Sequence, residues 1–110
     1  MIIDFNRMEE VATPQFKGGT GDAVFRTYND GTNKIMLGRL DTGCSIGNHL
    51  HETNSEIIYV LSGEARCLYD GTEEQLNAGM CHYCPQGHEH SLINASESTP
   101  LIFLAIVSNC

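Results

Sequence analysis

The stretch GCSIGNHLHETNSE, residues 43–56, carries the strongest structural signal in this chain. In it, a single residue separates His49 from His51, and Glu56 follows five positions after the second histidine. Residues two apart on a β-strand project to the same side, so the two imidazoles can bind one ion together. If the turn after His51 folds back, the Glu56 carboxylate meets them from an adjacent strand. The stretch therefore predicts part of a metal site on two neighbouring strands.

A third histidine is available in the segment PQGHEHSLIN, residues 85–94. This segment holds both His88 and His90, and spacing alone does not choose between them. Three neutral imidazoles and one carboxylate suit the divalent ions of Mn, Fe, Co, Ni, Cu and Zn. Four protein ligands also leave coordination positions open for a small molecule. The sequence thus predicts one divalent transition-metal ion as cofactor, and a small-molecule ligand or substrate.

The rest of the chain has the pattern of strands rather than helices. No window carries apolar residues at helical spacing between recognisable caps, whereas short apolar runs alternate with glycine, Asn and Asp. Asp30-Gly31 predicts a hairpin turn. Besides the strand with the paired histidines, we predict strands at residues 22–28, 34–40, 56–63, 64–70, 80–85, 91–94 and 101–107. About eight short strands at this spacing are typical of an all-β barrel or sandwich.

Composition limits the partners of the protein. A chain of 110 residues fits one domain. Its 14 acidic and 6 basic residues give a formal net charge of -8, which argues against nucleic acid and anionic membranes as partners.

The opening segment lacks a signal-peptide core, and the 5 cysteines are an odd number. We therefore expect a cytoplasmic protein with free thiols.

Two motifs resemble those of the cupins, a superfamily of small β-barrel proteins. The pattern G-x5-H-x-H-x3or4-E-x6-G falls on Gly43, His49, His51, Glu56 and Gly63. The pattern G-x5-P-x-G-x2-H-x3-N falls on Gly79, Pro85, Gly87, His90 and Asn94. The interval between the motifs, residues 64–78, is as short as in single-domain bacterial members.

The resemblance implies an all-β, jelly-roll barrel that binds the metal inside through His49, His51, Glu56 and His90. It therefore selects His90 over His88. It also implies a single cupin domain over residues 1–110, with the barrel core at 22–107 and an N-terminal segment, 1–21, packed on it.

Two residues within the second motif, between Gly79 and Pro85, are candidates for acid–base catalysis. His82 and Tyr83 lie in the predicted strand before Pro85, from which either side chain can reach a pocket. A partly exposed histidine without a role is the commoner outcome. We expect His88 to point to solvent. Arg39 binds a substrate carboxylate if it faces inward, but we favour an outward, solvated side chain.

Cys81 and Cys84 form a CxxC pair, which can be redox-active or hold zinc. Residues three apart on a strand face opposite sides, however, and no second CxxC exists to complete a zinc site. We therefore predict buried structural thiols here, and also at Cys44, Cys67 and Cys110. Cys81, Tyr83 or Cys67 can line the pocket, depending on the face that each takes.

The segments IIYVL and LIFLAIV, residues 57–61 and 101–107, are continuously apolar. Such strands are covered on both faces, and the barrel interior covers only one. We expect a homodimer to cover the other face. The alternative is an N-terminal segment that folds over the outside.

Three functions fit such a site. The first is a metalloenzyme of the dioxygenase, isomerase, decarboxylase or lyase type that acts on a small organic substrate. The second is a binding or sensor module without turnover, in which the ion anchors a ligand. In the third, the ion only cross-links the barrel. We favour the first, because the ligand set is complete in so short a chain.

Overall fold

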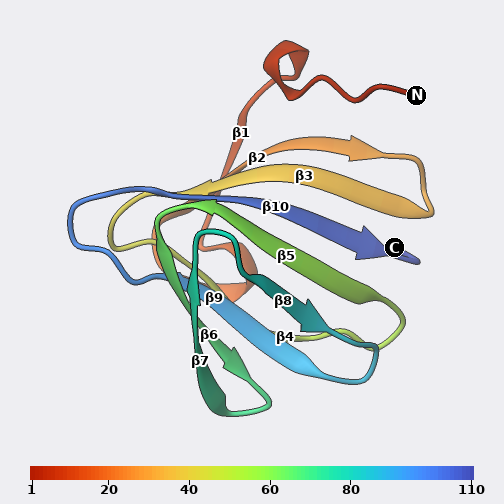
Figure 1. Ribbon diagram of the computed structural model, residues 1–110. Helices are drawn as coiled ribbons and strands as arrows, with labels where there is room; N and C mark the ends of the chain where they lie inside the picture. Colours follow the sequence, from red (N-terminus) through yellow and green to blue (C-terminus); the bar gives the residue numbers. More distant parts are fainter.

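Ten β-strands in two antiparallel sheets make up the structure, a computed structural model that describes residues 1–110. The six-stranded sheet has the order β1-β2-β3-β10-β5-β8, and the four-stranded sheet has the order β4-β9-β6-β7. The sheets face each other around one interior, which confirms the predicted jelly-roll barrel (Figure 1). The strands are β1 (Val11–Pro14), β2 (Asp22–Asn29), β3 (Asn33–Leu40), β4 (Ser45–Leu50), β5 (Ser55–Ser62), β6 (Glu64–Tyr69), β7 (Thr72–Asn77), β8 (Cys81–Cys84), β9 (Glu89–Asn94) and β10 (Leu101–Ser108). Two short 3-10 helices, η1 (Phe5–Arg7) and η2 (Phe16–Gly18), lie on either side of β1.

The predicted strands correspond to elements of the structure, but β1 and β7 had not been predicted from the sequence. Segment TEEQLN of β7 has a single apolar residue, Leu76, which is 3% exposed and faces the core. One buried leucine between polar residues is too weak a pattern to indicate a strand. β1 is an edge strand that ends at Pro14 and pairs only with β2. Proline is tolerated at such an edge because no ladder hydrogen bond is needed there.

Alternation along the strands creates the core between the sheets. In β10 the residues Leu101, Phe103, Ala105 and Val107 face inward and are buried, while the residues between them are half-buried. Gly38 of β3 pairs with Phe103, and a Cβ there would lie 2.4 Å from the Phe103 ring. The absence of a side chain at Gly38 leaves the space that this ring fills.

The outer face of the six-stranded sheet is apolar and partly exposed. Ile57, Tyr59 and Leu61 of β5 point outward with exposed fractions of 40%, 40% and 48%. The N-terminal segment reaches only one end of this sheet, where Arg26 Nη1 donates to the Phe5 carbonyl oxygen at 2.9 Å. The chain itself therefore does not cover the outer face of β5.

Glycines bring η2 against β4. A Cβ at Gly47 would lie 2.1 Å from the Lys17 carbonyl oxygen, and a Cβ at Gly19 would lie 2.1 Å from the Ser45 carbonyl oxygen. Only glycine permits this close approach of two backbones. Turns at Gly63 and Gly87 have φ of 95° and 90°, a backbone conformation that glycine adopts without strain. No helix of the structure is long and apolar enough to cross a lipid bilayer.

Candidate metal centre

Four donor side chains meet in the interior, between the two sheets. His49 on β4 lies directly opposite His90 on β9, and His51 follows the end of β4. Glu56 projects from β5 of the other sheet and reaches the imidazoles across the interior. The sequence analysis had predicted that it would reach them from an adjacent strand. Its Oε1 lies 2.9 Å from His90 Nε2, 3.2 Å from His51 Nε2 and 3.9 Å from His49 Nε2. All four ligand atoms lie within 4.8 Å of one another.

The outer nitrogens of two imidazoles contact hydrogen-bond acceptors. His49 Nδ1 lies 2.8 Å from the Gly47 carbonyl oxygen, and His51 Nδ1 contacts the side-chain oxygen of Asn54. A neutral imidazole that donates its Nδ1–H to an oxygen keeps a free lone pair on Nε2. His49 and His51 therefore present Nε2 lone pairs to the centre of the site.

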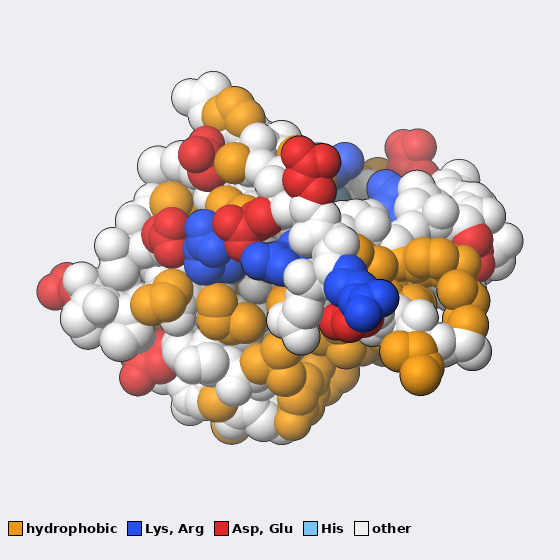
Figure 2. Space-filling view, turned by 90° about the horizontal axis from the view of Figure 1, so that it is seen from above, with side chains coloured by type: hydrophobic (Ala, Val, Ile, Leu, Met, Phe, Trp, Pro, Cys, Tyr) orange, Lys and Arg blue, Asp and Glu red, His pale blue; other side chains and the backbone are white.

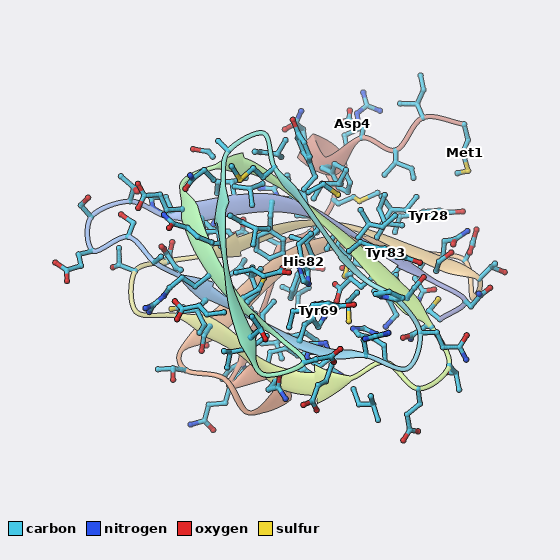
Figure 3. All side chains as sticks on the ribbon, turned by 60° about the horizontal axis from the view of Figure 1, so that its bottom comes forward. Met1, Asp4, Tyr28, Tyr69, His82 and Tyr83 are labelled. Carbon is cyan, nitrogen blue, oxygen red and sulfur yellow. The ribbon has the colours of Figure 1, made fainter.

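His90 is held from behind by a second histidine. His90 Nδ1 lies 3.0 Å from His82 Nε2, and His82 Nδ1 lies 2.7 Å from Glu74 Oε1. The Glu74 carboxylate accepts the His82 Nδ1–H, which leaves His82 Nε2 to accept the His90 Nδ1–H. The two rings stack with centroids 5.2 Å apart, and Tyr69 meets His82 edge-on in the interior (Figure 3). The Glu74–His82 pair thus sets the same tautomer at His90 as at the other two donors.

This donor set fits a cation. With every Nδ1–H directed outward, three Nε2 lone pairs and a carboxylate oxygen face one another, and the Nε2 atoms of His51 and His90 are only 2.9 Å apart. His51, Glu56 and His90 have exposed fractions of 7%, 9% and 1%, so water does not screen the repulsion between these atoms. A divalent ion bound by all four atoms satisfies them at once.

The charge states of Glu56 and His90 agree with this role. Burial acts to raise the pKa of Glu56, but contacts with the three imidazoles outweigh burial and hold this pKa well below its usual value. Burial lowers the pKa of His90, which favours its neutral form. The contact with Glu56 raises the pKa of His51, so a metal ion must compete with a proton for this imidazole. An ionised carboxylate and neutral imidazoles are the forms that bind metal ions.

The donors open into a cavity of about 380 Å³. Its wall includes the apolar side chains of Phe25, Met36, Ile46 and Ile58. This volume lies within the range of small-molecule binding sites. The site therefore combines a buried donor group with space for an organic ligand.

The two candidate acid–base residues lie on opposite faces of β8. His82 is 4% exposed and contacts the donor His90, but it does not line the cavity. Tyr83 is 55% exposed on the outer face of the sheet and has no contact with the donor group (Figure 3). His82 therefore acts on the site only through His90, and the geometry gives no role to Tyr83.

Two further charged or titratable residues lie away from the cavity, as expected from the sequence. His88 is half-exposed and contacts the Asp70 carboxylate. Arg39 faces outward and forms ion pairs with Glu10 at 2.9 Å and with Asp41 at 3.2 Å. Neither side chain can reach a ligand at the donor group.

The cysteines are not all buried, which corrects one expectation. Cys67 and Cys84 are buried, and burial raises their pKa to about 12 and about 11, so both thiols stay protonated. Cys44 is half-buried, whereas Cys81 and Cys110 are exposed. Cys81 and Cys84 face opposite sides of β8, so they form neither a disulfide nor a shared metal site. The prediction failed at Cys81 because the outer face of β8 is not covered.

Comparison with known proteins agrees with this geometry. The family model of the cupin domain, Cupin_2, matches residues 36–107. The chain belongs to the cupin family. This cupin is 36% identical to an oxalate-binding protein of Thermotoga maritima, over 97% of this chain and 93% of the relative.

Solved structures show the same fold. A predicted oxalate decarboxylase from Thermotoga maritima superimposes with a TM-score of 0.92 and 25% identity, with both chains covered over 100% of their length. A sugar phosphate isomerase of the cupin superfamily from Silicibacter pomeroyi has a TM-score of 0.81 and 19% identity, and the match covers 100% of this cupin and 76% of that chain. The second likeness extends to the fold alone.

We expect the Glu74→Gln variant to bind divalent metal about 10–100-fold more weakly than the wild type. The neutral amide of the new glutamine can donate an N–H of its NH2 group to His82 Nδ1. The His82 tautomer that accepts the His90 Nδ1–H, and so orients His90, is then no longer fixed. Isothermal titration with Zn²⁺ measures this effect. Glu73→Gln is the matched control, because Glu73 lies next to Glu74 on β7 but is 61% exposed and pairs with Arg66. Equal losses in both variants would show that overall charge, and not the contact with His82, determines the affinity.

Proposed function

We propose that this cupin holds one divalent transition-metal ion at His49, His51, Glu56 and His90 and acts there as a metalloenzyme on a small organic acid. The observation that carries the proposal is the set of three Nε2 lone pairs and one carboxylate that face one another inside a cavity. The name of the Thermotoga maritima relative, an oxalate-binding protein, supports a carboxylate as ligand.

Mn, Fe, Co, Ni, Cu and Zn ions all suit this mixed nitrogen and oxygen set. When bound, such an ion supplies Lewis acidity toward a carboxylate or carbonyl oxygen. The protein residues contribute orientation: the Gly47 carbonyl, Asn54 and the Glu74–His82 pair each fix one imidazole. The apolar side chains of the wall, among them Phe25 and Ile58, lower the polarity around a bound acid and so strengthen its charge interactions at the donors.

The proposal is tested on protein purified from its own cells. Elemental analysis is expected to find one transition-metal ion per chain, and titration with ¹³C-labelled oxalate is expected to show saturable binding that chelation abolishes. NMR then follows the label. Conversion of oxalate and one proton into formate and carbon dioxide identifies decarboxylation. A chain without stoichiometric metal, or one that binds oxalate equally well after chelation, contradicts the proposal.

A binding or sensor module remains the second candidate, because no cavity-lining acid or base outside the donor group has been identified as catalytic. Metal-dependent binding without any product, across a panel of small acids under oxygen, supports this candidate. The third reading, an ion that only cross-links the barrel, is tested by thermal melts with and without chelator. It predicts a large loss of stability on chelation and no ligand binding.

We also propose that the protein forms a homodimer through the outer face of the six-stranded sheet. Ile57 lies between Ile106 of β10 and Tyr83 of β8. Two residues further along β5, Tyr59 lies next to Leu104 of β10. Figure 2 shows hydrophobic side chains gathered on this side of the molecule, beside a group of charged ones. Contiguous apolar surface of this kind marks interaction sites, and two-fold dimers are the commonest assemblies.

The Ile57→Lys variant is expected to be monomeric by light scattering where the wild type is dimeric, because a two-fold axis brings two added charges together in an apolar interface. Leu68→Lys is the matched control, since Leu68 is 38% exposed on β6 of the other sheet. A wild type that is monomeric at all concentrations contradicts the proposal. Dissociation of both variants would show that an added surface charge, and not its place on this face, separates the subunits, which contradicts the assigned interface.

A further inference from the structure

Positive charge is distributed unevenly in this acidic protein. The four arginines, Arg7, Arg26, Arg39 and Arg66, all form ion pairs with carboxylates. The only two lysines, Lys17 and Lys34, form none, and both line the cavity that contains the donor group. The two cations without an acidic partner therefore lie at the one cavity that opens onto the donors.

The protein backbone holds both lysines in place. Lys17 lies on η2, whose backbone contacts Gly47 of β4, two residues before the donor His49. Lys34 begins β3 and pairs with Val107 of β10, another residue of the cavity wall. Both lysines thus line one cavity from separate elements, and the packing of those elements determines their backbone positions.

Burial places the lysines at the rim of the cavity. His51, Glu56 and His90 are buried, whereas Lys34 is half-buried and Lys17 is exposed. Lys17 Nζ lies 5.5 Å from the centre of the Phe16 ring, which also lines the cavity. A ligand that enters therefore has the donor group at its inner end and the ammonium groups at its outer end.

The wall between these polar groups includes a cluster of apolar side chains. Of the 18 lining residues 8 are hydrophobic, among them Phe16, Phe25, Met36 and Ile46. The volume of about 380 Å³ accommodates a ligand much larger than oxalate, whose two carboxylates are joined directly. Oxalate at the donor group would leave these apolar side chains and both lysines without a partner.

We propose that the preferred ligand is a dicarboxylic acid with an apolar middle, bound with one carboxylate at the donor group and the other at Lys17 and Lys34. This inference rests on the proposed function, since it needs the metal-bound carboxylate as its first anchor. Hydrogen bonds between ammonium and carboxylate groups are about twice as strong as neutral ones. The local lysines also offset the repulsion that a formal net charge of -8 exerts on an anionic ligand.

Calorimetric titration of the metal-loaded protein tests the inference. The probes are succinate, adipate and suberate, each compared with the monocarboxylic acid of the same chain length. We expect at least one diacid to bind about tenfold more tightly than its monoacid. The Lys17→Gln/Lys34→Gln variant is expected to lose this preference, while its metal content and its melting temperature stay unchanged.

The matched control is Arg7→Gln/Arg66→Gln, which removes the same net charge from exposed positions outside the cavity and should keep the preference for the diacid. If no diacid is preferred, or if the lysine and arginine variants behave alike, the inference is overturned while metal and oxalate binding leave the proposed function intact. A wild type that binds neither metal nor oxalate overturns both.

Discussion

The His90→Ala variant is expected to lose stoichiometric binding of divalent transition-metal ions while it remains a folded barrel. His90 is 1% exposed and lies opposite His49, so its removal takes one of four donors from the centre of the site. Loss of a partner behind a metal ligand typically costs 10–100-fold in affinity, and loss of the ligand itself should cost more than about 100-fold. Titration with Zn²⁺ and elemental analysis measure the loss, and circular dichroism checks the fold.

His88→Ala is the matched control, because His88 lies two residues earlier in the same segment and outside the donor group. Its half-exposed ring contacts Asp70, and we expect metal binding to be unchanged without it. If the His90→Ala variant still binds one ion tightly per chain, the assignment of the site is wrong. If both variants lose the ion, a general disturbance of the loop before β9 explains the result.

The Phe103→Ala variant is expected to be destabilised by about 3–5 kcal/mol. Phe103 is 1% exposed, and its ring lies between the two sheets with its centroid 6.0 Å from that of Phe25. Removal of the ring leaves a cavity that the surrounding strands, held by their ladders, cannot close. Denaturant unfolding of the metal-free protein measures the loss without a contribution from bound ions.

A double-mutant cycle with Gly38 tests the reason for this cost. A Cβ at Gly38 would lie 2.4 Å from the Phe103 ring, so Gly38→Ala should destabilise the wild type by about 1–3 kcal/mol. In the Phe103→Ala background the same substitution meets empty space and should cost little. Additive effects of the two substitutions would contradict direct contact between these positions.

The sequence was informative wherever a pattern is local. Short apolar runs bounded by glycine, Asn and Asp identified seven strands, which correspond to β2, β3, β5, β6, β8, β9 and β10 within one or two residues of their ends. The pairing of His49 and His51 on one side followed from the two-residue period of a strand. Both patterns involve residues that are neighbours in the sequence, so they can be read without knowledge of the fold.

Predictions failed where the result depends on what lies outside the strand. β7 was missed because only Leu76 faces the core, and Cys81 was expected to be buried although it is exposed. Asn54 and Glu74, which orient two donors, carry no motif and no spacing that could have identified them. A strand pattern shows that two faces differ, but not what covers each face.

The sequence by itself indicated short strands of an all-β barrel or sandwich, and it grouped His49, His51 and Glu56, because both follow from residue spacing along the chain. The jelly-roll barrel and the choice of His90 over His88 followed from the resemblance to the cupin motifs. Only the tertiary structure decided that Glu56 reaches the imidazoles from the opposite sheet, that His82 lies behind His90, and that both lysines line one cavity. These are distances between residues far apart in sequence. They depend on the register and packing of the two sheets, which no local pattern encodes.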